Sequence, residues 1–144
     1  MDDFFMCATK QEIINFLETE FAPSLKHCTI VDVGEKSATL IWHVTEKDLR
    51  PGNTVSGPTM MTLADFALYV AILAEIGIVG LAVTTSMNIN FLRKPEANKD
   101  LRGECRLLKV GKSIIYGEVL VYSEGVEEPV AHITGSYSIP PQQL

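Results

Sequence analysis

The chain has few cysteines and histidines, and they are scattered. It contains three of each, and none forms a CxxC, a CxxH or another metal-ligand spacing: Cys7, Cys28, Cys105, His27, His43 and His132. An odd, widely spaced set of cysteines excludes a disulfide framework and a zinc site of the usual kind. The sequence therefore predicts a protein that holds no metal.

Positive charge is also scarce, with 12 Lys and Arg against 18 Asp and Glu and a net charge of −6. This balance argues against nucleic acid as a partner. The first seven residues carry no basic group of the kind that opens a signal peptide. The longest apolar stretches are interrupted by Asp65, Glu75 and glycines, which argues against a membrane span. We expect a cytoplasmic protein that contacts no membrane.

The composition is that of a folded domain, with 47% hydrophobic and 21% charged residues in 144 positions. Residues 1–144 are expected to form a single domain with an ordinary core. Periodicity and turn residues predict a short helix, a hairpin, a long helix and four more strands, over residues 9–21, 25–33, 37–45, 58–76, 82–93, 101–110, 113–123 and 129–139. One apolar helix and a single antiparallel sheet pack best when the sheet curls around the helix, which is an α+β arrangement.

The central helix has an unusual start. Ser56 is placed to cap it, and Pro58 fits its first turn because the N–H that proline lacks has no partner there. Free N–H groups and the helix dipole at this end favour a developing negative charge. Asp65 follows as an isolated carboxylate on an otherwise apolar helix, where it needs a partner or a chemical role. We therefore treat Asp65 as a candidate catalytic residue.

In the strand that follows, simple alternation predicts one polar face made of Thr84, Ser86, Asn88 and Asn90. This polar strand is a candidate for pairing with its symmetry mate in a homodimer.

Three stretches of the chain together carry a family resemblance. They are Gly57 through Asp65-Phe-Ala, Thr84-Thr-Ser-Met-Asn-Ile-Asn-Phe-Leu-Arg93, and Gly103-Glu-Cys-Arg with Gly111-Lys112. The chain resembles the hotdog-fold acyl-CoA thioesterases of the phenylacetic-acid-degradation (PaaI-like) type, over residues 50–139. The resemblance implies a hotdog fold and hydrolysis of an acyl-CoA thioester to a free acid and coenzyme A. It also implies a homodimer or homotetramer with no metal or covalent cofactor.

The same resemblance assigns roles to three residues. Gly57 would supply the backbone N–H that polarises the thioester carbonyl, Asp65 would be the general base or nucleophile, and Thr84 would help to hold the attacking water. Gly57 and Asp65 are eight residues apart, about 12 Å along a helix that rises 1.5 Å per residue. One chain cannot bring both to the same carbon, so the site implies two chains.

The chain also departs from the family pattern at the start of the helix. Ser56 stands at the position of the family's His, Pro58 at that of its second Gly, and Arg50 at that of an upstream Asn. Asn53 is the nearby candidate to replace that Asn. These losses favour an alternative, a non-catalytic hotdog domain that binds acyl-CoA. A hotdog hydratase is a weaker alternative, because its Asp-x-x-x-x-His motif is missing.

Coenzyme A carries phosphates, and this acidic chain offers few clusters of cations to meet them. Arg93 and Lys94 end one strand, and Lys109 and Lys112 flank a later turn. We expect the two pairs to converge at one rim of the sheet and bind the phosphates. The alternative is that all four are ordinary solvated charges.

Overall fold

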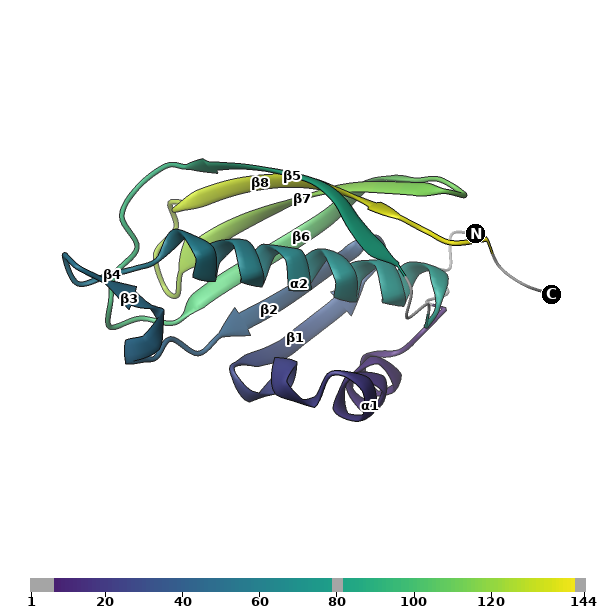
Figure 1. Ribbon diagram of the computed structural model, residues 1–144, viewed down its shortest axis with the longest axis horizontal. Helices are drawn as coiled ribbons and strands as arrows, with labels where there is room; N and C mark the ends of the chain where they lie inside the picture. Colours follow the sequence, from purple (N-terminus) through teal and green to yellow (C-terminus); the bar gives the residue numbers. More distant parts are fainter. Residues whose placement is uncertain (1–6, 79–81, 142–144) are drawn as a thin grey trace.

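A long helix lies across one face of an antiparallel sheet in the computed structural model, which describes residues 7–78 and 82–141 (Figure 1). The helices are α1 (Lys10–Glu20), α2 (Gly57–Ile76) and the short 3-10 turns η1 (Ala22–Lys26) and η2 (Glu46–Asp48). The strands are β1 (Cys28–Gly34), β2 (Ser37–Trp42), β3 (Leu49–Arg50), β4 (Thr54–Val55), β5 (Val83–Phe91), β6 (Leu101–Val110), β7 (Ile114–Ser123) and β8 (Ala131–Ser138). The predicted α+β hotdog arrangement is confirmed.

Six strands form the main sheet in the order β1-β2-β6-β7-β8-β5. The strand that follows α2 therefore crosses to the far edge and pairs with β8, the last strand of the chain. Because β5 is an edge strand, one side of its backbone is open to another chain. Several of its side chains are exposed, among them Val83 and Phe91 at 55% and 54%.

The core lies between α2 and the sheet. Twelve of the 20 residues of α2 are buried, so the helix is covered on more than one side. Two glycines under Leu68 allow this close packing, because an added Cβ would lie 2.8 Å from that side chain at Gly117 and 3.0 Å at Gly135. Larger residues at these positions would push the helix off the sheet.

By length and composition, α2 is apolar enough to cross a membrane, a test that the core helices of soluble proteins also pass. In the structure, 61% of its most apolar window is buried inside the molecule. The sheet and α1 thus supply the apolar surroundings that its composition requires.

Capping and turn residues in the sequence predicted most helix and strand ends correctly. Thr9 and Glu12 form the predicted capping box at the start of α1, with hydrogen bonds of 2.9 and 3.1 Å. The first strand begins later than predicted, because residues 22–26 form the 3-10 turn η1, with Pro23 in its first turn. Residues 51–53 form the turn of the small β3–β4 hairpin that precedes α2.

Candidate active site

Two hydroxyl groups hold one oxygen of the Asp65 carboxylate. Thr84 Oγ1 donates a hydrogen bond of 2.7 Å to Asp65 Oδ1, and the Tyr137 hydroxyl donates one of 2.6 Å to the same atom. The Tyr137 hydroxyl also lies 3.1 Å from the Asp65 backbone oxygen. Among the described residues, none donates a hydrogen bond to Oδ2. One carboxylate oxygen is therefore fixed while the other is available.

A β-bulge brings Thr84 to Asp65. Thr84 pairs with Tyr137 and Ser86 pairs with Ser136, so Thr85 is an extra residue that has no partner in the ladder. Simple alternation, which placed Thr84 on the face of Ser86, is therefore wrong at this point. Thr84 lies on the helix side of the sheet, where Met87 also packs against the core.

Tyr137 is a functional candidate that the sequence analysis missed. It is 4% exposed, and burial, followed by the neighbouring Asp65 charge, raises the pKa of its hydroxyl. Its position near the end of the last strand gave no sign of a role. Only the pairing of β8 with β5, which sets Tyr137 opposite Thr84, brings it into the site.

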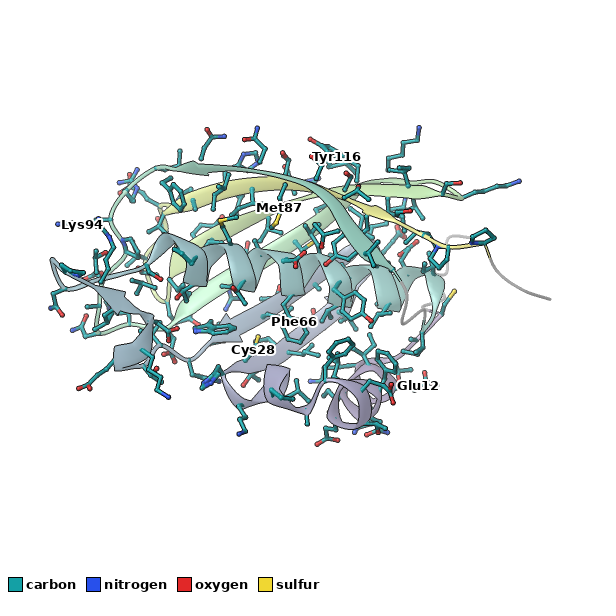
Figure 2. All side chains as sticks on the ribbon, viewed as in Figure 1. Glu12, Cys28, Phe66, Met87, Lys94 and Tyr116 are labelled. Atoms are coloured by element: carbon teal, nitrogen blue, oxygen red, sulfur yellow. The ribbon has the colours of Figure 1, made fainter. Side chains whose placement is uncertain are left out.

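An apolar cavity of about 580 Å³ opens beside Asp65. Half of its ten lining residues are aromatic, and none of the described lining residues is Lys, Arg or His. The lining consists of Phe21, Trp42, Thr62, Asp65, Phe66, Tyr69, Ala82, Val83, Thr84 and Tyr137. Figure 2 marks Phe66 on the part of α2 that carries Asp65. The cavity therefore suits an uncharged, apolar group next to a single carboxylate.

A second cavity, of about 460 Å³, opens at the start of α2. Its walls carry Gly57 together with three cations, Arg50, Arg93 and Lys94. The Phe91 ring covers Gly57 closely, since an added Cβ would lie 3.0 Å from the ring edge. Arg93 is partly engaged already, with its Nε donating 3.1 Å to the Pro129 oxygen and a 3.4 Å ion pair to Glu128. This cavity suits an anion near the helix N-terminus.

The expected convergence of the two cation pairs is wrong within one chain. Arg93 and Lys94 follow the end of β5, where Phe91 pairs with Ala131. Lys109 and Lys112 lie at the β6–β7 turn, which is near the other end of β8 because Ile115 pairs with Tyr137. Figure 2 marks Lys94 at the β3–β4 end of the molecule, whereas the β6–β7 turn lies at the opposite end of Figure 1.

Asn53, the candidate to replace the family Asn, lies in the turn of the β3–β4 hairpin. It occupies a left-handed position with φ 56° in the exposed β3–β4 turn, directly after Gly52 with φ 100°. Asparagine tolerates this conformation better than most residues, so its place here is explained by the turn. It lines neither of the two cavities.

The start of α2 is held by a network that the sequence analysis also missed. Ser56 acts as the predicted cap, accepting from the Thr59 N–H at 3.3 Å, and the Thr59 hydroxyl donates to Asp48 Oδ1 at 3.2 Å. Asp48 Oδ2 accepts from the Trp42 indole at 3.1 Å. Ser56 thus caps α2 and Pro58 occupies its first turn, and neither lines the two cavities of the single chain.

The fold and the placement of Asp65 agree with a family assignment. The family model of the thioesterase superfamily matches residues 52–130, more than half of the chain. The chain therefore belongs to the thioesterase superfamily.

Individual proteins support the assignment. A protein from Silicibacter sp. TM1040, provisionally named a thioesterase, has 43% identity, a TM-score of 0.87 and 94% coverage of both chains. The PaaI protein from the phenylacetic acid degradation operon of E. coli shares the fold, with a TM-score of 0.80, 20% identity and coverage of 92% and 94%. A provisionally named esterase of Thermoplasma volcanium is 34% identical over 90 residues, 62% of this chain and 66% of its own length. The aligned part thus spans just under two thirds of that relative.

Proposed function

We propose that this chain hydrolyses an acyl-CoA thioester to a free acid and coenzyme A. The observation that carries the proposal is the Asp65 carboxylate, which has one fixed and one available oxygen at the wall of an apolar cavity. The acyl group occupies that cavity. Since the described lining offers no cation, acyl groups that end in a second carboxylate are disfavoured.

The Asp65 carboxylate acts as the general base. Oδ2 accepts a proton from a water molecule as that water attacks the thioester carbon, and the carbon–sulfur bond then breaks to release the coenzyme A thiolate. The Gly57 N–H, at the positive end of α2, hydrogen-bonds the carbonyl oxygen as it becomes negative. A donor of this kind contributes about 3 kcal/mol in other acyl-transfer enzymes. The same geometry is compatible with an alternative, in which Asp65 attacks the thioester carbon directly and forms an anhydride intermediate that water then hydrolyses.

The site is completed by a second copy of the chain. Gly57 and Asp65 line different cavities of one chain, so the N–H that meets a thioester at Asp65 comes from a partner subunit. The open edge of β5 is the surface through which we expect the two sheets to join. Dimers and dimers of dimers both satisfy this requirement.

The cavity at Gly57 receives the phosphate-bearing part of coenzyme A. Arg50, Arg93 and Lys94 supply the positive charge there. A hotdog-fold protein of Streptococcus pneumoniae, described as a hypothetical thioesterase with coenzyme A, has a TM-score of 0.76 and 14% identity to this chain. The coenzyme A in that structure supports coenzyme A as the carrier of the substrate here.

A hydrolysis screen over acyl-CoAs of varied length and aromatic character, followed by free thiol release, tests the proposal. Asp65→Asn keeps the shape of the side chain and removes the base, so kcat should fall about 100-fold or more. Asp32→Asn, an exposed carboxylate on β1, is the matched control and should keep the wild-type rate. Hydrolysis by Asp65→Asn at the wild-type rate would show that the base is elsewhere.

The substitutions of the family His and Asn by Ser56 and Arg50 favour a second function, binding of acyl-CoA without turnover. Calorimetric titration with a non-hydrolysable thioether analogue separates the two. Tight binding with no turnover of any thioester in the screen would support the binding function and overturn the hydrolase.

A further inference from the structure

We propose that Tyr137 is a positioning residue, which holds Asp65 Oδ1 so that Oδ2 faces the cavity. This inference rests on the proposed function, in which Oδ2 takes the proton of the attacking water. It assigns a role to a side chain on the last strand, far in sequence from Asp65. The geometry that carries it is the 2.6 Å hydrogen bond, which ends on the same oxygen as the bond from Thr84.

Tyr137 is rigidly placed for this task. Its ring is almost wholly buried and stacks on Tyr69, with centroids 6.1 Å apart and an interplanar angle of 22°. Its backbone is paired on both sides, with Thr84 of β5 and Ile115 of β7. A donor that cannot move fixes the rotation of a carboxylate far better than a flexible one.

Two donors on one oxygen also determine which oxygen reacts. A carboxylate has two equivalent oxygens, and free rotation would exchange them in the site. Thr84 alone leaves this rotation partly open, because its single bond does not define the carboxylate plane. The second bond, from Tyr137, arrives from the neighbouring strand, and together the two leave Oδ2 as the acceptor for water.

Hydroxyl groups, and no cation among the described lining residues, contact the Asp65 carboxylate. The titratable groups among the described lining residues are Asp65, Tyr69 and Tyr137, from α2 and β8. Hydroxyl donors are therefore the groups that hold Oδ1 in place. Because burial and the Asp65 charge raise the pKa of the Tyr137 hydroxyl, it keeps its proton and remains a donor.

Tyr137→Phe tests this role, since it keeps the ring and its stacking and removes only the donor. We expect kcat to fall about 10-fold while KM changes less, because the ring that lines the cavity is retained and the lost hydrogen bond ends on Asp65. Thr84→Ser, which retains its hydroxyl, should behave closer to the wild type than Thr84→Val does.

A second measurement needs no turnover and so separates this inference from the proposed function. Carbon-13 NMR of the aspartate carboxyl groups at one fixed pH follows Asp65 directly, with its signal assigned by its absence from Asp65→Asn. In Tyr137→Phe the chemical shift of this carboxyl group should change, because Oδ1 loses a hydrogen bond. Tyr69→Phe is the matched control, because it removes a phenol oxygen that has no hydrogen-bond partner among the described residues. Its KM is free to change, since Tyr69 lines the cavity, but its Asp65 chemical shift should stay at the wild-type value.

The outcomes divide clearly. A changed Asp65 chemical shift in Tyr137→Phe together with an unchanged one in Tyr69→Phe supports the positioning role, even if no thioester in the screen is hydrolysed. Equal Asp65 chemical shifts in Tyr137→Phe and the wild type would overturn it, and a fall in kcat beside equal chemical shifts would assign Tyr137 a structural role only.

Discussion

Gly57 and Asp65 belong to the same helix and open into different cavities. Gly57 lines the cavity with the three cations, and Asp65 lines the aromatic cavity. Eight residues of helix separate them by about 12 Å, which is too far for one thioester carbon to reach both. The helix therefore contributes its N-terminus to one site and its middle to the other if the chain forms a symmetric dimer.

Subunit mixing tests this sharing. Gly57→Pro removes the N–H and adds a ring beside Phe91, and the backbone of Ser56, with φ −71° and ψ 153°, already suits a following proline. Gly57→Pro and Asp65→Asn should each lower kcat about 100-fold or more. Coexpressed in equal amounts, they should recover about a quarter of the wild-type activity, because half of the dimers are mixed and each has one intact site.

Gly57→Ala serves as the control for this experiment, since it keeps the N–H and makes the same contact with the Phe91 ring. It should lose much less activity than Gly57→Pro. No recovery on mixing, or a monomer mass near 15.9 kDa by light scattering, would contradict the shared site.

Charge removal at the second cavity tests where coenzyme A lies. Arg50→Ala combined with Lys94→Ala should raise KM about 10-fold at low salt and change kcat much less, because these contacts hold substrate and transition state alike. The effect should shrink at 0.5 M salt, where exposed charges are screened. Lys26→Ala, an exposed lysine in η1, is the control. An unchanged KM in the double variant would place the phosphates elsewhere, with Lys109 and Lys112 as the next candidates.

Tyr69→Phe should make the protein more stable. The Tyr69 hydroxyl is buried and has no hydrogen-bond partner in the described structure, a state that costs about 1–3 kcal/mol. Urea unfolding should show a free energy of unfolding about 1 kcal/mol above the wild-type value. Tyr137→Phe should shift stability in the opposite direction, because its hydroxyl is paired. A loss of stability in Tyr69→Phe would mean that this hydroxyl has a partner in solution.

The sequence correctly predicted those features that depend on residues close together in the chain. The Thr9 capping box and the Ser56 cap depend on neighbours within a few residues, and each is found as predicted. The turn at Gly111 likewise separates two strands of the expected length. In each case the residues that interact are close in sequence, so the interaction can be predicted from the local pattern of residues.

Long-range pairing accounts for what the sequence did not reveal. Tyr137 reaches Asp65 because β8 pairs with β5, and no local pattern states which strands are neighbours. The same limit explains the cation pairs, since Arg93 and Lys112 were assigned to one rim without knowledge of the strand order. Asp48 was missed because its partners, Trp42 and Thr59, lie on either side of an irregular segment.

The extra residue at Thr85 lets one strand follow two alternation patterns. Before it, Thr84 turns inward to the carboxylate; after it, Ser86, Asn88 and Asn90 are exposed while Met87 supports the core. If residues 84–90 alternated strictly, Thr84 would lie on the same face as Ser86, and either the contact with Asp65 or the contact of Met87 with the core would be lost. Because Tyr137 and Ser136 are consecutive, removal of Thr85 would leave a regular ladder in which Thr84 still pairs with Tyr137 and Ser86 with Ser136, so the position beside Asp65 would stay filled.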